Sequence, residues 1–423
     1  MQAILKWIEE VLMPPMAKLS EQRHLKAIRD GIISTLSLII VGSFFLVIAF
    51  PPIPALADLV APHIGDILIP FRMTMGLMSL YAAYGMGYSL AKSYKLDGVS
   101  GGVLSLAAFL MTTIPVSVKD PVGVGWAVPM GPLGGSGMFV AILAMIFAVE
   151  LLRFFKKNNI TIKMPDQVPE SVARSFEALF PAAAIITSIW IVRVLFGFDI
   201  NAAISALFKP IVNIAGDTMG GVLVPVLFIT ILWSAGVHGM SVIGSLVRPI
   251  WLVLLDENIA AAAAGNALPH IAPEPFFQWF IWIGGAGATL SLCILLCFSK
   301  SKYLKSVGRF SIIPGIFNIN EPLIFGAPIV MNPILAIPFI LAPVVSGIVA
   351  FAATSLGLVA RVSIIAPWTL PAPLGAFMAT GGDWRAIVLV LINMGVCLVI
   401  YYPFFKVYEK KMIAEENQTV ETV

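Results

Sequence analysis

Long apolar runs alternate with short polar segments along most of the chain. Each run has about the 20 residues that a helix needs to cross the hydrocarbon core of a bilayer. The runs cover residues 31–50, 73–91, 99–118, 138–152, 175–196, 220–237, 279–298, 333–357, 362–380 and 386–405. This pattern predicts an all-α polytopic membrane protein with about ten transmembrane helices.

Two stretches do not have the pattern of a simple membrane-spanning helix. Charged residues, prolines and an alanine-rich run interrupt residues 238–278, and a single carboxylate, Glu321, interrupts the apolar stretch 310–347. Interrupted segments of this kind form the discontinuous elements of transporters, where irregular backbone lines a cavity. We therefore expect two re-entrant hairpins. We also expect the amphipathic segment 2–19 to lie on the membrane surface, and 198–214 to form a weakly amphipathic external segment.

Glu321 is the most informative residue of the second stretch. An ionisable group at a helix centre in the membrane costs about 3 kcal/mol, so it is usually paired or faces a water-filled cavity. Pro322 disfavours helical geometry at Glu321 and removes a backbone donor, which predicts a broken helix or hairpin. Two readings stay open: Glu321 binds a ligand, or it caps a broken helix or pairs with an arginine.

The composition supports the membrane assignment. The 423 residues are 59% hydrophobic and 12% charged, with a mean hydropathy of +0.95, which is far from the composition of soluble domains. The net charge of +3 does not suggest a nucleic-acid partner. The N-terminus lacks the features of a signal peptide, so we expect no cleaved segment.

Lysine and arginine clusters predict the orientation and the domains. They occur at 23–29, 92–95, 153–163, 300–309 and 406–411, which places both termini in the cytoplasm. The clusters at 153–163 and 300–309 could also dock a partner, although membrane anchoring explains them as well. We expect N-terminal transmembrane helices at 1–157, a cytoplasmic linker at 158–172, a substrate-binding transmembrane region at 173–411, and a cytoplasmic tail at 412–423.

Two asparagines flank the carboxylate. Asn318 and Asn320 add donors and acceptors beside Glu321, a combination that suits sugar hydroxyls and exceeds what a helix cap needs. We therefore predict that Glu321, Asn318 and Asn320 bind substrate.

Other candidates lie at the ends of apolar runs. His238 follows Trp233 and sits between Gly236 and Gly239, which allow close approach of backbone or ligand; the alternative is a hydrogen-bonded core histidine. Trp368 lies in a proline-rich irregular stretch, and an indole face can stack on a sugar ring, although an interfacial anchor is the alternative. We add His238, Trp233 and Trp368 to the predicted substrate site.

Other charged residues carry no predicted chemistry. Arg248, Arg361 and Arg385 could neutralise carboxylates or phosphate or simply anchor the chain, and Asp256, Glu257 and Glu274 are interpreted as exposed hairpin ends. The sequence has no phosphate loop, metal-ligand cluster or nucleophile with a base. We expect no metal, no cofactor and no phosphoryl-carrying residue in this chain.

Three motifs together resemble a known family. They are the block from Leu19 to Gly31, the Trp-Ser-x-Gly-x-His-Gly element that ends at Gly239, and Phe317-Asn-Ile-Asn-Glu-Pro-Leu-Ile-Phe-Gly326. From end to end the chain resembles enzyme IIC, the membrane permease of the bacterial sugar phosphotransferase system, in its lactose, cellobiose and N,N′-diacetylchitobiose branch.

The resemblance implies a homodimer with most of its contact between N-terminal helices, and a disaccharide enclosed by the C-terminal half and two re-entrant hairpins. It implies that Glu321 holds the sugar C6 hydroxyl with His238 beside it, and that a phosphocysteine on a separate enzyme IIB donates the phosphoryl group. The tail after Tyr408 is too short to fold as such a domain. The alternative is a proton-coupled sugar transporter in which Glu321 and His238 relay a proton. The sequence leaves the identity of the disaccharide open.

Overall fold

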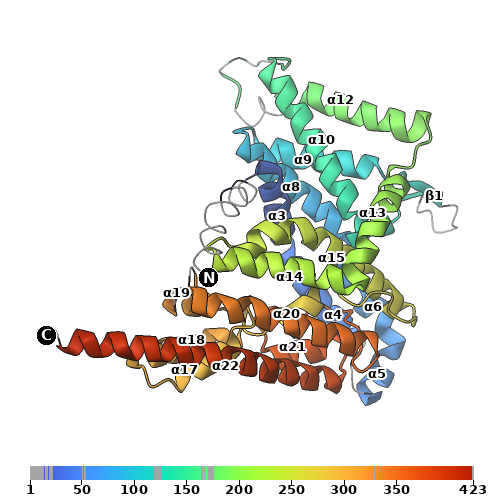
Figure 1. Ribbon diagram of the computed structural model, residues 1–423. Coiled ribbons are helices and arrows are strands. Elements are labelled where there is room, and N and C mark those ends of the chain that lie inside the picture. Colours follow the sequence, from blue (N-terminus) through green and yellow to red (C-terminus); the bar gives the residue numbers. More distant parts are fainter. Residues whose placement is uncertain are drawn as a thin grey trace. The chain divides into compact units, whose positions relative to one another are not determined.

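The protein is almost entirely helical in its computed structural model (Figure 1). The structure describes residues 22–49, 51, 54–118, 125–162, 165, 167–169, 176–327, 329–330 and 332–421, together with Pro14 and Lys18. The amphipathic helix predicted over 2–19 lies almost wholly outside the described residues, as does part of the predicted linker 158–172.

The chain forms two compact units. The first unit contains residues 1–19, 46–64 and 213–423, and the second contains residues 20–45 and 65–212. This division differs from the one predicted at 158–172: residues 173–212 fall in the second unit, and residues 1–19 and 46–64 fall in the first. The roles assigned to the two halves, dimer contact and substrate binding, stay predictions.

The second unit is built mainly on four helices, α3, α8, α9 and α10, which pack on one another. Its elements are α3 (Arg23–Ser34), most of α4 (Leu36–Ala49), most of α6 (Ile64–Ile67), α7 (Ile69–Thr74), η3 (Met75–Leu77), α8 (Met78–Ser93), α9 (Gly98–Met111), β1 (Val116–Val118), β2 (Gly125–Ala127), η4 (Gly131–Leu133), η5 (Gly135–Gly137), α10 (Met138–Lys157), α12 (Leu179–Trp190), η6 (Ile191–Leu195) and most of α13 (Ile200–Asp217). The two strands form an antiparallel hairpin with Val116 opposite Ala127.

Glycines allow these helices to approach closely. A Cβ atom on Gly31 of α3 would lie 2.2 Å from Cγ of Met86 on α8, and one on Gly87 would lie 2.5 Å from the carbonyl oxygen of Gly101 on α9. Small residues at such positions are typical of helix packing in membranes, where van der Waals contact replaces the hydrophobic effect.

The first unit holds every predicted site residue. Its elements are α5 (Pro54–Val60), η2 (Ala61–His63), α14 (Met219–Ser234), α15 (Gly239–Ala263), α16 (Glu274–Phe276), η7 (Phe277–Ile281), α17 (Leu290–Cys297), α18 (Lys302–Ile316), α19 (Glu321–Gly326), α20 (Pro333–Ser355), α21 (Ala372–Ala379) and α22 (Trp384–Glu421), with the ends of α4 and α13. Helix α20 packs against α14 and α22, and α17 packs against α18 and α22. Asn393 of α22 donates to the carbonyl oxygens of Phe280 (2.8 Å) and Ser346 (3.3 Å), which ties three elements together inside the apolar core.

The helix lengths agree with a polytopic membrane protein. Within the described residues, five helices are long and apolar enough to span a bilayer, and the pair 179–195 and 200–217, bent by 85°, brings the number to six. Shorter apolar helices occur at Gly98–Met111 and Met219–Ser234. The count of ten spans and the two re-entrant hairpins stay predictions.

Two predicted spans are wrong. The run 362–380 does not form one helix, because residues 360–371 are irregular and α21 covers only Ala372–Ala379. Residues 279–298 were expected to form one helix, but η7 ends at Ile281 and α17 begins only at Leu290. The intervening loop contains Gly284, Gly285 and Gly287 at φ values of +78°, +99° and +88°, a left-handed backbone that ends a helix. By contrast, the interrupted pattern at 239–263 folds as one helix of 25 residues, α15, with Pro249 inside it.

Candidate functional site

The chain breaks its helical path directly before Glu321. Helix α18 ends at Ile316, and Asn318 takes a left-handed conformation with φ +63°. The amide of Ile319 donates to the carbonyl oxygen of Pro314 (3.0 Å), which closes the helix end. Helix α19 then begins at Glu321 with Pro322 in its first turn, where a missing N–H costs nothing. The helix break predicted from Pro322 is confirmed.

The Asn318 side chain joins two loops. Its Oδ1 accepts a hydrogen bond from the amide of Gly284 (3.0 Å), and its Nδ2 donates to the carbonyl oxygens of Trp368 (2.8 Å) and Leu370 (2.9 Å). Both amide hydrogens are therefore used within the protein. Asn318 fixes the glycine loop 282–289 and the irregular segment that carries Trp368 against the residues that precede α19.

Asn320, the residue directly before α19, binds the same glycine loop. Its Nδ2 donates to the carbonyl oxygen of Ala286 (2.7 Å) and to Oγ1 of Thr289 (3.1 Å). A Cβ atom on Gly285 would lie 2.4 Å from Cγ of Asn320, so only glycine fits at 285 beside this amide. Asn318 and Asn320 are 8% and 5% exposed, which means that both are buried hydrogen-bonding residues.

Glu321 differs from both neighbours because its side chain is exposed. Its backbone is fixed, since the amides of Leu323 and Ile324 in the first turn of α19 donate to the carbonyl oxygen of Asn320 (3.0 and 2.9 Å). The N-terminal position also places the carboxylate at the positive end of a short helix. The site thus presents one carboxylate on a backbone that two buried amides hold in place.

His238 and Trp233 form a pair at the turn between α14 and α15. Their ring centroids are 4.3 Å apart, and Nδ1 of His238 accepts a hydrogen bond from the amide of Ser241 (3.2 Å), so His238 caps α15. His238 is exposed, whereas Trp233 is 5% exposed with an indole Nε1 that has no hydrogen-bond partner among the described residues. The turn is tight, because a Cβ atom on Gly239 would lie 2.1 Å from the carbonyl oxygen of Ile229.

Trp368 lies in an irregular stretch, residues 360–370, that we term the crossing segment. The amide of Ala360 donates to Asp383 (2.8 Å), and the amide of Ser363 donates to the carbonyl oxygen of Ala379 (2.9 Å). Asn318 holds the far end through Trp368 and Leu370. Trp368 itself is 45% exposed, so its indole face is available while its backbone is anchored.

The structure brings several of the predicted residues into linked segments. Asn318 joins the glycine loop to the segment of Trp368, and Asn320 joins the same loop to α19. The turn that holds Trp233 and His238 meets the chain that follows α19, since a Cβ atom on Gly236 would lie 3.1 Å from Val330. The exposed members of the set are Glu321, His238 and Trp368.

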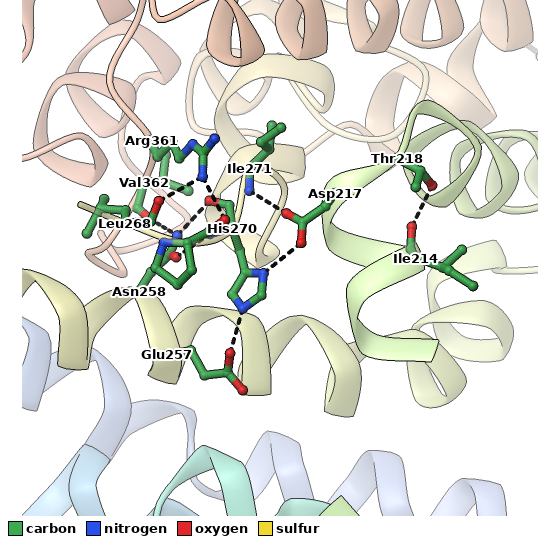
Figure 2. A network of polar contacts seen from close by, with 11 residues as sticks. Ile214, Asp217, Thr218, Glu257, Asn258, Leu268, His270, Ile271, Arg361 and Val362 are labelled. Atoms are coloured by element: carbon green, nitrogen blue, oxygen red, sulfur yellow. Dashed lines mark hydrogen bonds and ion pairs between the residues drawn. The ribbon is translucent and has the colours of Figure 1, made fainter. Parts of the chain in front are cut away.

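A second polar cluster occurs in the same unit, and Figure 2 shows it around His270. We call Asp217, Glu257, Asn258, His270 and Arg361 the His270 network. Nδ1 of His270 lies 3.0 Å from Asp217 Oδ2, and Nε2 lies 2.6 Å from Glu257 Oε2. His270 is 4% exposed. An imidazole between two carboxylates is stabilised in its charged form.

Asn258 and Arg361 complete the His270 network (Figure 2). Asn258 accepts from the amide of His270 (2.8 Å) and donates to the carbonyl oxygens of His270 and Val362 (both 2.9 Å). Arg361 donates to the carbonyl oxygens of Leu268 (2.7 Å) and Pro269 (2.6 Å). The network therefore fastens the loop 264–273 to α15, to the end of α13 and to the crossing segment.

The carboxylates determine the protonation of His270. Burial lowers the pKa of the imidazole, but the hydrogen bonds and negative charges of Asp217 and Glu257 outweigh that effect and raise the pKa to about 9. His270 is therefore an imidazolium at neutral pH.

A family model described as "Phosphotransferase system, EIIC" matches residues 29–343. The chain belongs to this EIIC family. The cellobiose-specific EIIC component of Geobacillus stearothermophilus is 41% identical to this EIIC over 99% of the chain and 97% of the relative. The lactose-specific EIICB component of Staphylococcus haemolyticus is 33% identical, and the match covers 99% of this chain and 72% of that protein.

The fold of this EIIC also matches a solved structure. The transporter ChbC, the IIC component from the N,N′-diacetylchitobiose-specific phosphotransferase system, superposes with a TM-score of 0.91 at 39% identity. The match covers 97% of this chain and 99% of ChbC. This EIIC is thus a multi-pass integral membrane protein of the lactose, cellobiose and diacetylchitobiose branch, as the motifs predicted.

The prediction for the acidic residues of 256–274 needs correction. Glu257 lies within helix α15 and binds His270, and Glu274 pairs with Arg248 with its side chain only 17% exposed. Neither residue is a free hairpin end. A signal was present in the sequence of this EIIC: Asn258 falls on the helix face of the buried residues Trp251 and Leu254, where a polar side chain needs internal partners.

Proposed function

We propose that this EIIC binds a disaccharide such as N,N′-diacetylchitobiose or cellobiose, carries it inward by alternating access, and presents its C6 hydroxyl for phosphorylation by a separate phospho-IIB. Glu321 holds the hydroxyl, His238 lies beside it, and Trp233 and Trp368 flank the sugar. The sugars for which these relatives are named, cellobiose and N,N′-diacetylchitobiose, support this choice.

One observation carries the proposal: Glu321 is exposed, whereas the buried amides of Asn318 and Asn320 on either side of the helix break hold the loops around it. A binding carboxylate works best when its supporting shell is rigid and its own oxygens are available. In this arrangement Asn318 and Asn320, which the sequence predicted as sugar ligands, contribute by positioning the glycine loop and the segment of Trp368.

The proposed reaction is the transfer of a phosphoryl group from IIB to the sugar. The phosphorus–sulfur bond of the phosphocysteine on IIB breaks as the C6 oxygen attacks phosphorus, and the cysteine leaves as a thiolate. The hydroxyl proton passes to Glu321 or to His238. Phosphoryl transfer depends mainly on positioning, so the chain needs no nucleophile of its own.

The assembly is also part of the proposal. The relative whose name joins the C and B components supports a IIB partner for this chain. We infer cytoplasmic termini from the lysine and arginine clusters at the ends of the apolar runs. The resemblance to enzyme IIC proteins supports a homodimer with most of its contact in the N-terminal helices. Phosphorylation on the cytoplasmic side then traps the sugar.

The experiment uses the full protein in liposomes. Radiolabelled diacetylchitobiose is offered without an ion gradient, with cellobiose and lactose as unlabelled competitors, and phospho-IIB is enclosed in one set of vesicles. We expect equilibration without IIB and accumulation of sugar phosphate with it. Accumulation of free sugar that requires a proton gradient and ignores phospho-IIB would instead establish the proton-relay alternative.

A further inference from the structure

Two glutamates in the C-terminal half of α22, Glu409 and Glu416, bind the chain at the start of α18. Helix α22 is the long red helix that runs to the C-terminus in Figure 1. Glu409, which is 3% exposed, accepts a hydrogen bond from the amide of Lys300 (2.6 Å), and Glu416 accepts from Oγ of Ser301 (2.6 Å) and the amide of Tyr303 (2.9 Å). Both carboxylates therefore neutralise the positive N-terminal end of α18.

This arrangement leaves the neighbouring cations on the surface. Lys302, Lys305 and Arg309 are three, four and seven positions apart on α18, so they share one helix face. We define the basic surface by its five residues: Lys300, Lys302, Lys305, Arg309 and Lys410. None of these five forms an ion pair with a carboxylate in the part of the chain that the structure describes. Glu416 lies beside Lys302, but its oxygens are bound to the start of α18.

Helix α18, which carries most of the basic surface, contacts the helix that begins with Glu321 through another of its faces. Oη of Tyr303 donates to the carbonyl oxygen of Gly326 (2.6 Å), the last residue of α19. A Cβ atom on Gly326 would lie 3.0 Å from Cγ1 of Val307, so α18 and α19 are in contact. Five residues of helix rise by about 8 Å, which is the distance along α19 from Gly326 back to Glu321.

The surface also lies where a water-soluble protein can reach it. After Arg309 the exposed residues of α18 become apolar, with Phe310 74% and Ile313 66% exposed. A change from exposed cations to exposed apolar side chains along one helix marks the edge of the hydrocarbon region. The basic surface is on the aqueous side of that edge, and so are Tyr303 and Val307, the residues of α18 that contact Gly326 at the end of α19.

We propose that the basic surface is the docking site for phosphorylated IIB, and this rests on the function proposed above. A phosphoryl group carries a charge of about −1.5 to −2, and a set of unpaired lysines and arginines attracts such a partner from a distance and aligns it. A IIB protein bound at this surface would have its phosphoryl group beside α18, the helix that contacts α19. The cluster at 153–163, the other candidate in the sequence, belongs to the second unit and holds pairs such as Lys156 with Glu177.

The test compares two double variants of the full protein in liposomes. Lys302→Glu/Lys305→Glu reverses two charges of the basic surface, and Lys92→Glu/Lys95→Glu is the matched control, because both of its lysines are exposed and belong to another basic cluster. Sugar phosphorylation is measured against the concentration of phospho-IIB at low and high ionic strength, and sugar binding is measured without IIB.

We expect the first double variant to raise the KM for phospho-IIB by about tenfold at low ionic strength, with a smaller difference at high salt and unchanged sugar binding. The control should retain the wild-type KM. Equal KM values for the wild type and the first variant would overturn the proposal, and so would an equal loss in both variants. An effect that appears only when anionic lipid is present would assign the surface to the membrane instead. If the wild-type protein and phospho-IIB together produce no sugar phosphate, the function proposed above is wrong, and the docking proposal is wrong with it.

Discussion

The His270 network and the surroundings of Glu321 are two polar regions of the same unit, and they use their polar groups in opposite ways. In the His270 network each ring nitrogen of His270 meets a carboxylate, and Asn258 makes three hydrogen bonds. Beside the helix break the buried amides are similarly engaged, but Glu321 and His238 are exposed. A fully paired cluster holds segments together, whereas an exposed group on a paired framework is available to bind and react.

The largest effect is expected when Glu321, the exposed carboxylate beside the helix break, loses its charge. Glu321→Gln keeps the size and the hydrogen-bonding capacity of the side chain but removes its charge and its ability to accept a proton. We expect the rate of sugar phosphorylation by phospho-IIB to fall by about a hundredfold or more, with little change in thermal stability. Activity assays and melting curves of the purified protein check both parts. Wild-type rates in both Glu321→Gln and His238→Ala would remove these residues from the proposed site.

The second effect concerns the stability that the His270 network gives to the fold, and it is tested by removing the Asn258 amide. Asn258→Leu removes three hydrogen bonds and leaves the backbone of His270 and Val362 unsatisfied in a buried position. We expect a loss of about 3 kcal/mol in unfolding free energy. The matched control is Asn266→Leu, because Asn266 is an exposed asparagine of the neighbouring loop. Denaturation measurements should separate the two, and equal stability would mean that the His270 network does not hold the loop.

The third effect depends on pH and reaches its full size only below about pH 6.5. The folded pKa of His270 is about 9, above its ordinary value of 6.5, so the imidazolium stabilises the folded state. This contribution is complete below about pH 6.5, declines as the pH rises, and is lost above about pH 9; at its maximum it is roughly 3 kcal/mol. The difference in melting temperature between the wild type and His270→Gln should therefore shrink from pH 6 to pH 9.5. If the melting-temperature difference stayed constant from pH 6 to pH 9.5, the charge on His270 would not stabilise the folded state.

The sequence predicted the framework better than the paired contacts. Most apolar runs became helices, and Pro322 marked the break before Glu321, because hydropathy and proline act locally. The glycine loop after Ile281 was missed because its residues are individually apolar or small and continue a hydrophobic run; only the positive φ values reveal the break. The His270 network was missed because Asp217 and Val362 lie 53 and 104 positions from their partners, His270 and Asn258.

The candidate site shows the same limit. The residue types beside Glu321 predicted a polar binding region, but the sequence did not show that Asn318 and Asn320 are used to hold loops. Their partners are backbone atoms of the loop 284–289 and of Trp368 and Leu370, and a backbone carbonyl leaves no signal in the sequence. Side-chain chemistry can be anticipated from composition, whereas the assignment of each donor to an acceptor requires the fold.

The contact between Gly285 and Asn320 has a practical meaning for protein engineering. The amide of Asn320 fills the volume that any side chain at 285 would need, at a Cβ to Cγ distance of 2.4 Å. Position 285 is restricted twice, by this contact and by its φ of +99°, which strains any L side chain. A library that aims to change sugar preference by randomising 285 would therefore return almost only glycine, even when residue 320 is made smaller.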